Sequence, residues 1–80
     1  MLVSVKLNGM LRPYHPGPNR SLPLVVELAA GATPGDIVQT LALPHALARM
    51  IFINDVQASL DTPLQNDDRV GFFTIMVGGK

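Results

Sequence analysis

The 80-residue sequence predicts a small α+β domain in which one mixed sheet of four or five strands packs on one main helix. Apolar and polar residues alternate near both ends of the chain, which is typical of strands with one buried face. A single stretch, beginning after Thr33, combines helix-start signals with helical spacing of apolar residues. Because one helix cannot cover both faces of a sheet, the other face is expected to contact water.

Five segments have strand character, either as apolar alternation or as short β-branched runs between turn residues: 2–7, 22–28, 51–53, 56–60 and 69–74. The first two are separated by residues 12–21, where the density of proline and glycine predicts a loop without regular structure. Two alternating strands joined in this way are expected to form an antiparallel hairpin.

The helix is expected to begin after Thr33, whose side chain can cap the open amides. Pro34 suits the first helical position, and Asp36 places negative charge at the positive end of the helix. Pro44 stops the helix by residue 43, which gives a length of about ten residues. Residues 61–64 are expected to form one further helical turn capped by the aspartate at 61.

The final strand is alternating and apolar on one side, so we expect it at the centre of the sheet, parallel to the first strand. This arrangement is the β-grasp fold, the architecture of ubiquitin. The apolar positions that face the helix are expected to form the core: Val3, Val5, Leu7, Leu24, Val26, Ile37, Leu41, Ile53, Val70 and Phe72.

Composition excludes several classes of function. The formal net charge is zero, and a main partner that is nucleic acid or an anionic membrane surface needs a basic excess. The chain has no cysteine, which excludes disulfides and thiolate chemistry. Its first residues do not fit a signal peptide, and no apolar run approaches the roughly 20 residues of a membrane span. A cytoplasmic protein is therefore expected.

No catalytic or metal-binding constellation stands out. His15 and His45 lie far apart in the sequence, and neither has a carboxylate at ligand spacing. The pair Asp67-Asp68 is explained by turn chemistry. The serines have no neighbouring base. We therefore expect a protein that is not an enzyme and that binds no metal or cofactor.

The end of the chain is unusual, because an apolar run leads directly into Gly78-Gly79. A diglycine has no side chains, so it can thread into the active site of another protein with its backbone accessible. We expect a domain over residues 1–74 and a mobile, projecting tail over residues 75–80. Apolar residues at this junction are expected to dock a partner: Phe73, Ile75, Met76 and Val77.

The chain resembles the ThiS/MoaD family of ubiquitin-like sulfur-carrier proteins. The matching pieces follow one another in order along nearly the whole chain: Val3–Leu7, Met10–Arg12, Gly31–Thr33, Asp36–Val38, Leu41–Pro44, Ile51–Asn54, Asp61–Val70 and Gly78-Gly79. Each piece alone is a weak signal, whereas their order and spacing together are specific.

The resemblance implies that an E1-like enzyme adenylates the terminal glycine carboxylate with ATP. The product becomes a thiocarboxylate that donates sulfur to a synthase subunit in thiamine or molybdopterin-type cofactor biosynthesis. By this resemblance Gly79 would carry the sulfur, Gly78 would provide reach, and the apolar junction residues would dock the partner enzyme.

The sequence departs from the family pattern at several positions. Ala42, Asp55 and Asp67 stand where the family usually has glycine, and Thr74-Ile75 replaces prolines of the tail. Lys80 follows Gly79, so the glycine carboxyl is part of a peptide bond. Either a protease removes Lys80, or Lys80 is foreign to the native chain, or the chain is not a carrier.

Three functions remain open at this point. The chain can be a sulfur carrier, a β-grasp module that only binds other proteins, or a ubiquitin-like modifier joined to a lysine of another protein through Gly79. The first and the third need a free Gly79 carboxylate, and the second does not.

Overall fold

The computed structural model describes residues 1–17 and 23–74. Within these residues the chain forms five strands, one short α-helix and one 3-10 helix. In chain order the elements are β1 (Leu2–Leu7), η1 (Gly9–Tyr14), β2 (Leu24–Glu27), α1 (Pro34–Thr40), β3 (Met50–Ile53), β4 (Val56–Ala58) and β5 (Arg69–Phe73). The predicted strands are all present and differ only in their end residues.

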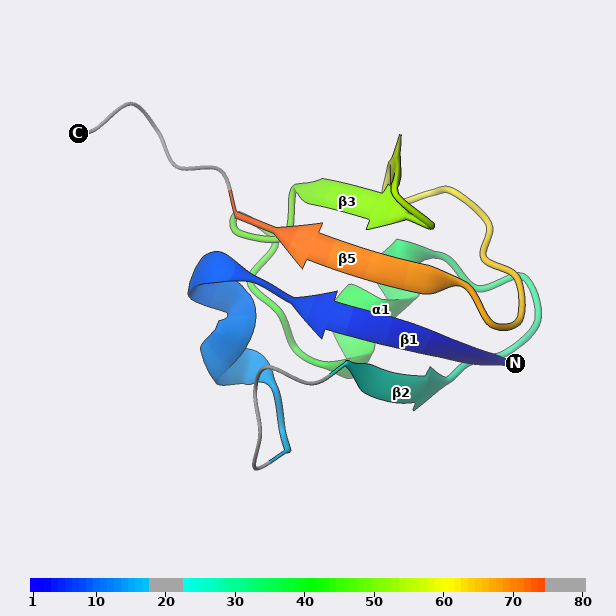
Figure 1. Cartoon of the computed structure of the whole chain (residues 1–80), viewed down its shortest axis with the longest axis horizontal. Helices are drawn as coiled ribbons and strands as arrows, with labels where there is room; N and C mark the ends of the chain where they lie inside the picture. The colour runs from blue at the N-terminus through cyan, green and yellow to red at the C-terminus, as the bar shows by residue number, and fades with distance from the viewer. Residues whose placement is uncertain (18–22, 75–80) are drawn as a thin grey trace.

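The strands form one mixed sheet in the order β2-β1-β5-β3-β4 (Figure 1). The central strands β1 and β5 run parallel, and the other neighbouring pairs are antiparallel. The parallel register places Val5 opposite Val70 and Leu7 opposite Phe72. The prediction that the last strand lies beside the first is confirmed, and the architecture is a β-grasp fold.

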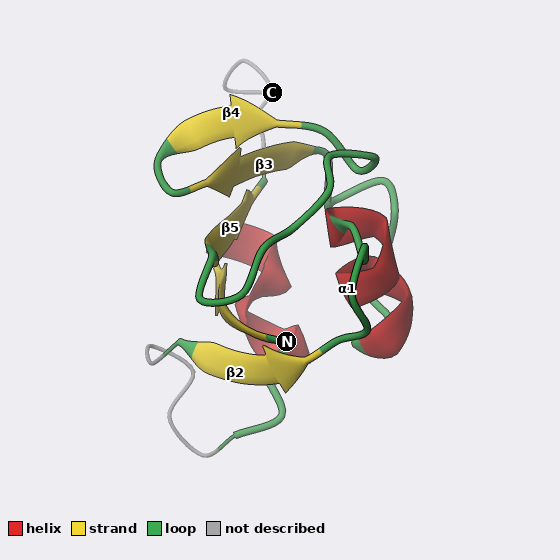
Figure 2. Ribbon diagram, turned by 90° about the vertical axis from the view of Figure 1, so that its right-hand side faces the viewer, coloured by secondary structure: helices red, strands yellow, loops and turns green. Residues whose placement is uncertain are grey.

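Helix α1 lies on one side of the sheet, and the core fills the space between them (Figure 2). Alternate residues of β1 and β5 point into this space, which explains the strict alternation of buried and accessible residues along both strands. The buried apolar residues are Val3, Val5, Leu7, Leu11, Val26, Leu28, Ala32, Ile37, Val38, Leu43, Ala48, Ile51, Leu64, Val70 and Phe72.

Three of the predicted core residues are only partly buried: Leu24, Leu41 and Ile53. Each lies at the end of an element, where solvent reaches one side of the chain. Leu24 begins β2, Leu41 follows the last residue of α1, and Ile53 ends β3. The fully buried residue of β3 is Ile51, which pairs with Phe72.

Helix α1 begins as predicted, with Pro34 as its first residue. The Asp36 carboxylate accepts the backbone N–H of Thr33 at 2.9 Å, which closes the first turn. The helix ends at Thr40, three residues before the predicted limit of 43. Its end is a Schellman motif: the N–H of Leu43 donates to the Val38 carbonyl at 2.9 Å, and the N–H of residue 42 donates to the carbonyl of residue 39.

Left-handed backbone occurs at each position where the ThiS/MoaD pattern usually has glycine. The φ angles are 54° at Ala42, 70° at Asp55 and 70° at Asp67. Aspartate tolerates this region because its short polar side chain can bond locally, whereas alanine there costs about 1–2 kcal/mol. The turns that glycine would form are therefore retained with other residues.

Two predictions about the connections were wrong. Residues 9–14 form the 3-10 helix η1, which extends into the segment predicted as an irregular loop and buries Leu11. A short 3-10 helix has no 3.6-residue periodicity for a sequence pattern to reveal. Residues 61–64 form no helical turn, so Asp61 is not a helix cap. This segment bends instead around a hydrogen bond from the Ser59 N–H to Thr62 Oγ1 at 3.1 Å.

Candidate functional site

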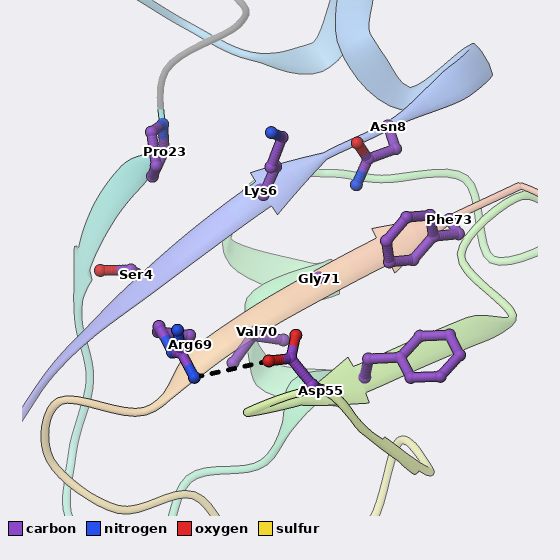
Figure 3. Close-up of a pocket in the computed structure, with 10 residues that line it drawn as sticks. Ser4, Lys6, Asn8, Pro23, Asp55, Arg69, Val70, Gly71 and Phe73 are labelled. Atoms are coloured by element: carbon purple, nitrogen blue, oxygen red, sulfur yellow. Dashed lines mark ion pairs between the residues drawn. The ribbon is translucent and has the colours of Figure 1, made fainter.

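The sheet face opposite α1 carries a groove of about 580 Å³ (Figure 3). It runs across β1, β5 and β3, and three further residues contribute from just after β1, just before β2 and the β3–β4 turn. The lining residues are Ser4, Lys6, Asn8, Pro23, Phe52, Asp55, Arg69, Val70, Gly71 and Phe73. The predicted water-facing side of the sheet is therefore not flat but hollowed along its central strands.

Two aromatic rings form the apolar part of the groove. Phe73 and Phe52 meet edge to face, with ring centroids 5.4 Å apart and an angle of 87° between the ring planes. Gly71 provides the space for this arrangement, because a Cβ at that position would lie 2.9 Å from Cε1 of Phe73. Phe73 keeps 38% of its surface accessible. An apolar side chain of a partner can therefore pack against these rings.

Charged side chains line the same groove as the aromatic pair. Lys6 is exposed and lies opposite Gly71 in the parallel register. Arg69 forms an ion pair with Asp55, with 3.6 Å between Nη2 of Arg69 and Oδ2 of Asp55 (Figure 3). The two side chains are 69% and 93% exposed. Exposed ion pairs contribute little to folding stability. These charges therefore remain able to exchange partners when another protein docks on the groove.

The groove adjoins the point where the tail begins. Phe73 is the last residue of β5 and Thr74 follows it. Among the residues predicted to dock a partner, Phe73 lies in the described part of the chain, and the structure places it in the groove. Ile75, Met76 and Val77 lie outside the described residues, as do Gly78 and Gly79. Their roles therefore stay predictions.

Of the residues that line the groove, sequence reasoning named only Phe73 as a docking residue, and Lys6, Phe52 and Arg69 are among those it missed. The alternation of β1 and β5 already placed Lys6 and Arg69 on the water-facing side. The sequence did not show which face of the sheet Phe52 occupies, because it lies between two isoleucines in a continuous apolar run that has no alternation of polar and apolar residues. The cross-strand partner of Phe52 is Gly71, which is visible only in the folded sheet.

The histidines do not form a second site. His15 is buried, and its Nδ1 accepts the backbone N–H of Gly17 at 2.9 Å. His45 is exposed in the turn after α1. Across residues 1–17 and 23–74, no three His, Cys, Asp or Glu side chains gather closely enough to hold a metal ion. In the same ranges, no helix has the length and apolar character needed to cross a membrane.

A five-stranded mixed sheet with one short helix packed on one face defines the class of ubiquitin-like β-grasp proteins. The sequence model of the ThiS family matches residues 5–79, and the chain belongs to this family. The fold is similar to the crystal structure of SAMP1 from Haloferax volcanii, with a TM-score of 0.75 and 20% sequence identity over 99% of this chain and 100% of that chain. No curated protein sequence gives a significant match.

Proposed function

We propose that the chain is a sulfur-carrier protein whose Gly79 is the carrier residue. The observation that carries this proposal is the ThiS family match, which runs through the diglycine and ends at Gly79. The β-grasp domain and the groove at the root of the tail support it, because they provide a folded body by which a partner can hold the chain. We propose that the sulfur is used in the biosynthesis of thiamine or of a molybdopterin-type cofactor.

The proposed chemistry proceeds in two steps. A carboxylate oxygen of Gly79 attacks the α-phosphorus of ATP in an E1-like enzyme, which releases pyrophosphate and forms an acyl adenylate. Hydrosulfide then attacks the acyl carbon, the bond between that carbon and the AMP oxygen breaks, AMP leaves, and loss of one proton gives the thiocarboxylate. Adenylation is needed because a free carboxylate is a poor electrophile. The chain supplies the acyl group, while ATP and the catalytic residues belong to the partner.

The aromatic groove is the proposed docking surface for the E1-like enzyme. Phe73 and Phe52 provide an apolar centre, and Lys6 and Arg69 provide a charged rim. An apolar centre within a polar rim is the usual anatomy of a protein interface. The sulfur-accepting synthase subunit is the second proposed partner, since the finished thiocarboxylate must be delivered to an acceptor.

A ubiquitin-like modifier is the alternative that the same observations support. It requires the same adenylation of Gly79 and differs in the acceptor, which is a lysine amine in place of a sulfur nucleophile. A module that only binds other proteins needs neither step. Activation of Gly79 therefore distinguishes the sulfur carrier and the modifier from the module that only binds other proteins.

Activation is expected only for a chain that ends at Gly79. In the chain that ends at Lys80, the acyl carbon of Gly79 belongs to an amide and has no carboxylate oxygen to attack ATP. With the E1-like enzyme of the same host, the Gly79-ended chain should support ATP–pyrophosphate exchange, and the Lys80-ended chain should support it only after trimming. Absence of exchange with both forms would contradict the carrier and the modifier alike and would favour the binding module.

A further inference from the structure

The root of the tail is held by hydrogen bonds from the segment that follows β1. Asn8 donates twice to the carbonyl of Phe72, from its backbone N–H at 3.1 Å and from Nδ2 at 3.2 Å. The backbone N–H of Met10 donates to Thr74 Oγ1 at 3.3 Å. We call these three hydrogen bonds the tail clamp. They tie the end of β5 and Thr74 to Asn8 and to the first turn of η1.

Gly9 lies inside the tail clamp and is required there for two reasons. Its φ angle is +60°, a backbone conformation that residues other than Gly, Asn and Asp rarely adopt. A Cβ at this position would also collide with Thr74 Oγ1. The close approach of Thr74 to the backbone of residues 9 and 10 therefore depends on glycine.

The tail clamp matters because it holds Thr74, the residue from which the chain continues toward Gly79. Residues 74–79 contain no proline, whose ring would fix a φ angle. Gly79 is the fifth residue after Thr74, which corresponds to a span of at most about 17 Å between their Cα atoms. The position and backbone direction of Thr74 therefore set where the path of the chain to Gly79 starts. Adenylation tolerates little misplacement of the reacting carboxylate.

We propose that Thr74 is a positioning residue for the activation of Gly79, and that Asn8, Gly9 and Met10 hold it in place. This inference rests on the proposed function. Thr74 touches neither ATP nor the acyl carbon, and it acts by setting the angle at which the chain leaves β5. The aromatic groove binds the partner, whereas the tail clamp directs the tail into the partner's active site.

The test compares Thr74→Val with Thr74→Ser in a chain that ends at Gly79. Valine keeps the branched shape and removes the hydroxyl acceptor, while serine retains the acceptor. Thr40→Val is the matched control, because Thr40 Oγ1 also bonds a backbone group, the Asp36 carbonyl at 2.8 Å, but lies in α1. Two quantities are measured: hydrogen exchange of the Met10 amide, and kcat and KM for ATP–pyrophosphate exchange with the E1-like enzyme of the same host.

Thr74→Val is expected to accelerate exchange of the Met10 amide and to lower kcat, each about five-fold, as expected from loss of one neutral hydrogen bond. KM should not change, because the groove is intact. Thr74→Ser and Thr40→Val should match the wild type in both quantities. A Thr74→Val variant with unchanged kcat, or one that raises KM alone, would overturn the positioning role.

The two proposals fail in different ways. A wild-type Met10 amide that exchanges like a fully exposed amide would show that the tail clamp does not form, whatever the enzyme does. A wild-type chain that ends at Gly79 and supports no pyrophosphate exchange would overturn the proposed function, and with it the positioning role. The amide measurement still decides in that case whether the clamp exists.

Discussion

Replacing Phe72 with alanine is expected to lower the free energy of unfolding by about 3–5 kcal/mol. Phe72 is fully buried in the central strand β5, opposite Leu7 on one side and Ile51 on the other. Its removal would leave a cavity that neighbouring strands cannot close, since both are held in register by the sheet. A domain of this size has a total stability of roughly 4–12 kcal/mol, so the variant should be partly unfolded near 37 °C.

Urea denaturation followed by far-ultraviolet circular dichroism measures this loss. Phe73→Ala is the matched control, because the neighbouring ring lies on the opposite face of the same strand and is 38% exposed. We expect the control to lose no more than about 1 kcal/mol, which corresponds to the aromatic contact with Phe52. Equal losses for the two variants would contradict the assignment of the two faces.

The same Phe73→Ala variant is expected to weaken docking strongly. In a chain that ends at Gly79, we predict that KM for the E1-like enzyme rises about 10- to 100-fold while kcat changes little. The ring lies beside Phe52 and close to Gly71 in the groove, and apolar anchors of this kind carry much of the binding energy at interfaces. Pyrophosphate-exchange kinetics over a range of chain concentrations measure both constants.

Val25→Ala is the control for docking. Val25 pairs with Ser4 in the antiparallel register, so it lies on the same face of the sheet, and it is 64% exposed. It belongs to the edge strand β2 and does not line the groove. Its KM should match that of the wild type. If Val25→Ala and Phe73→Ala have the same effect, the partner does not use the groove.

The fold could be predicted from local patterns because the pattern and the packing agree. Val3, Val5 and Leu7 alternate with polar residues, which predicts a strand with one buried face, and the structure buries all three side chains. The Thr33-Pro34 start of the helix needed no long-range information, because capping is decided within one turn. The parallel pairing of the first and last strands then followed from the need to place both apolar strands against a single helix.

The connections and the groove could not be predicted in this way. Leu11 is fully buried although it lies in η1, because tertiary contacts fold a proline-containing segment into a 3-10 helix. Phe52 and Phe73 are 21 positions apart in the sequence, and their contact exists because β3 and β5 pair. The tail clamp likewise joins residues 64 positions apart, so no local pattern could reveal it.

The central claim is that Gly79 carries sulfur, and the intact mass of the chain isolated from its native host tests it most directly. The account predicts a chain that has lost Lys80 and a fraction that is about 16 Da heavier, as required when one carboxylate oxygen is replaced by sulfur at the acyl carbon. A Gly79 found only in an isopeptide bond to another protein would identify a modifier. A chain that retains Lys80 throughout and gains no mass would contradict the account.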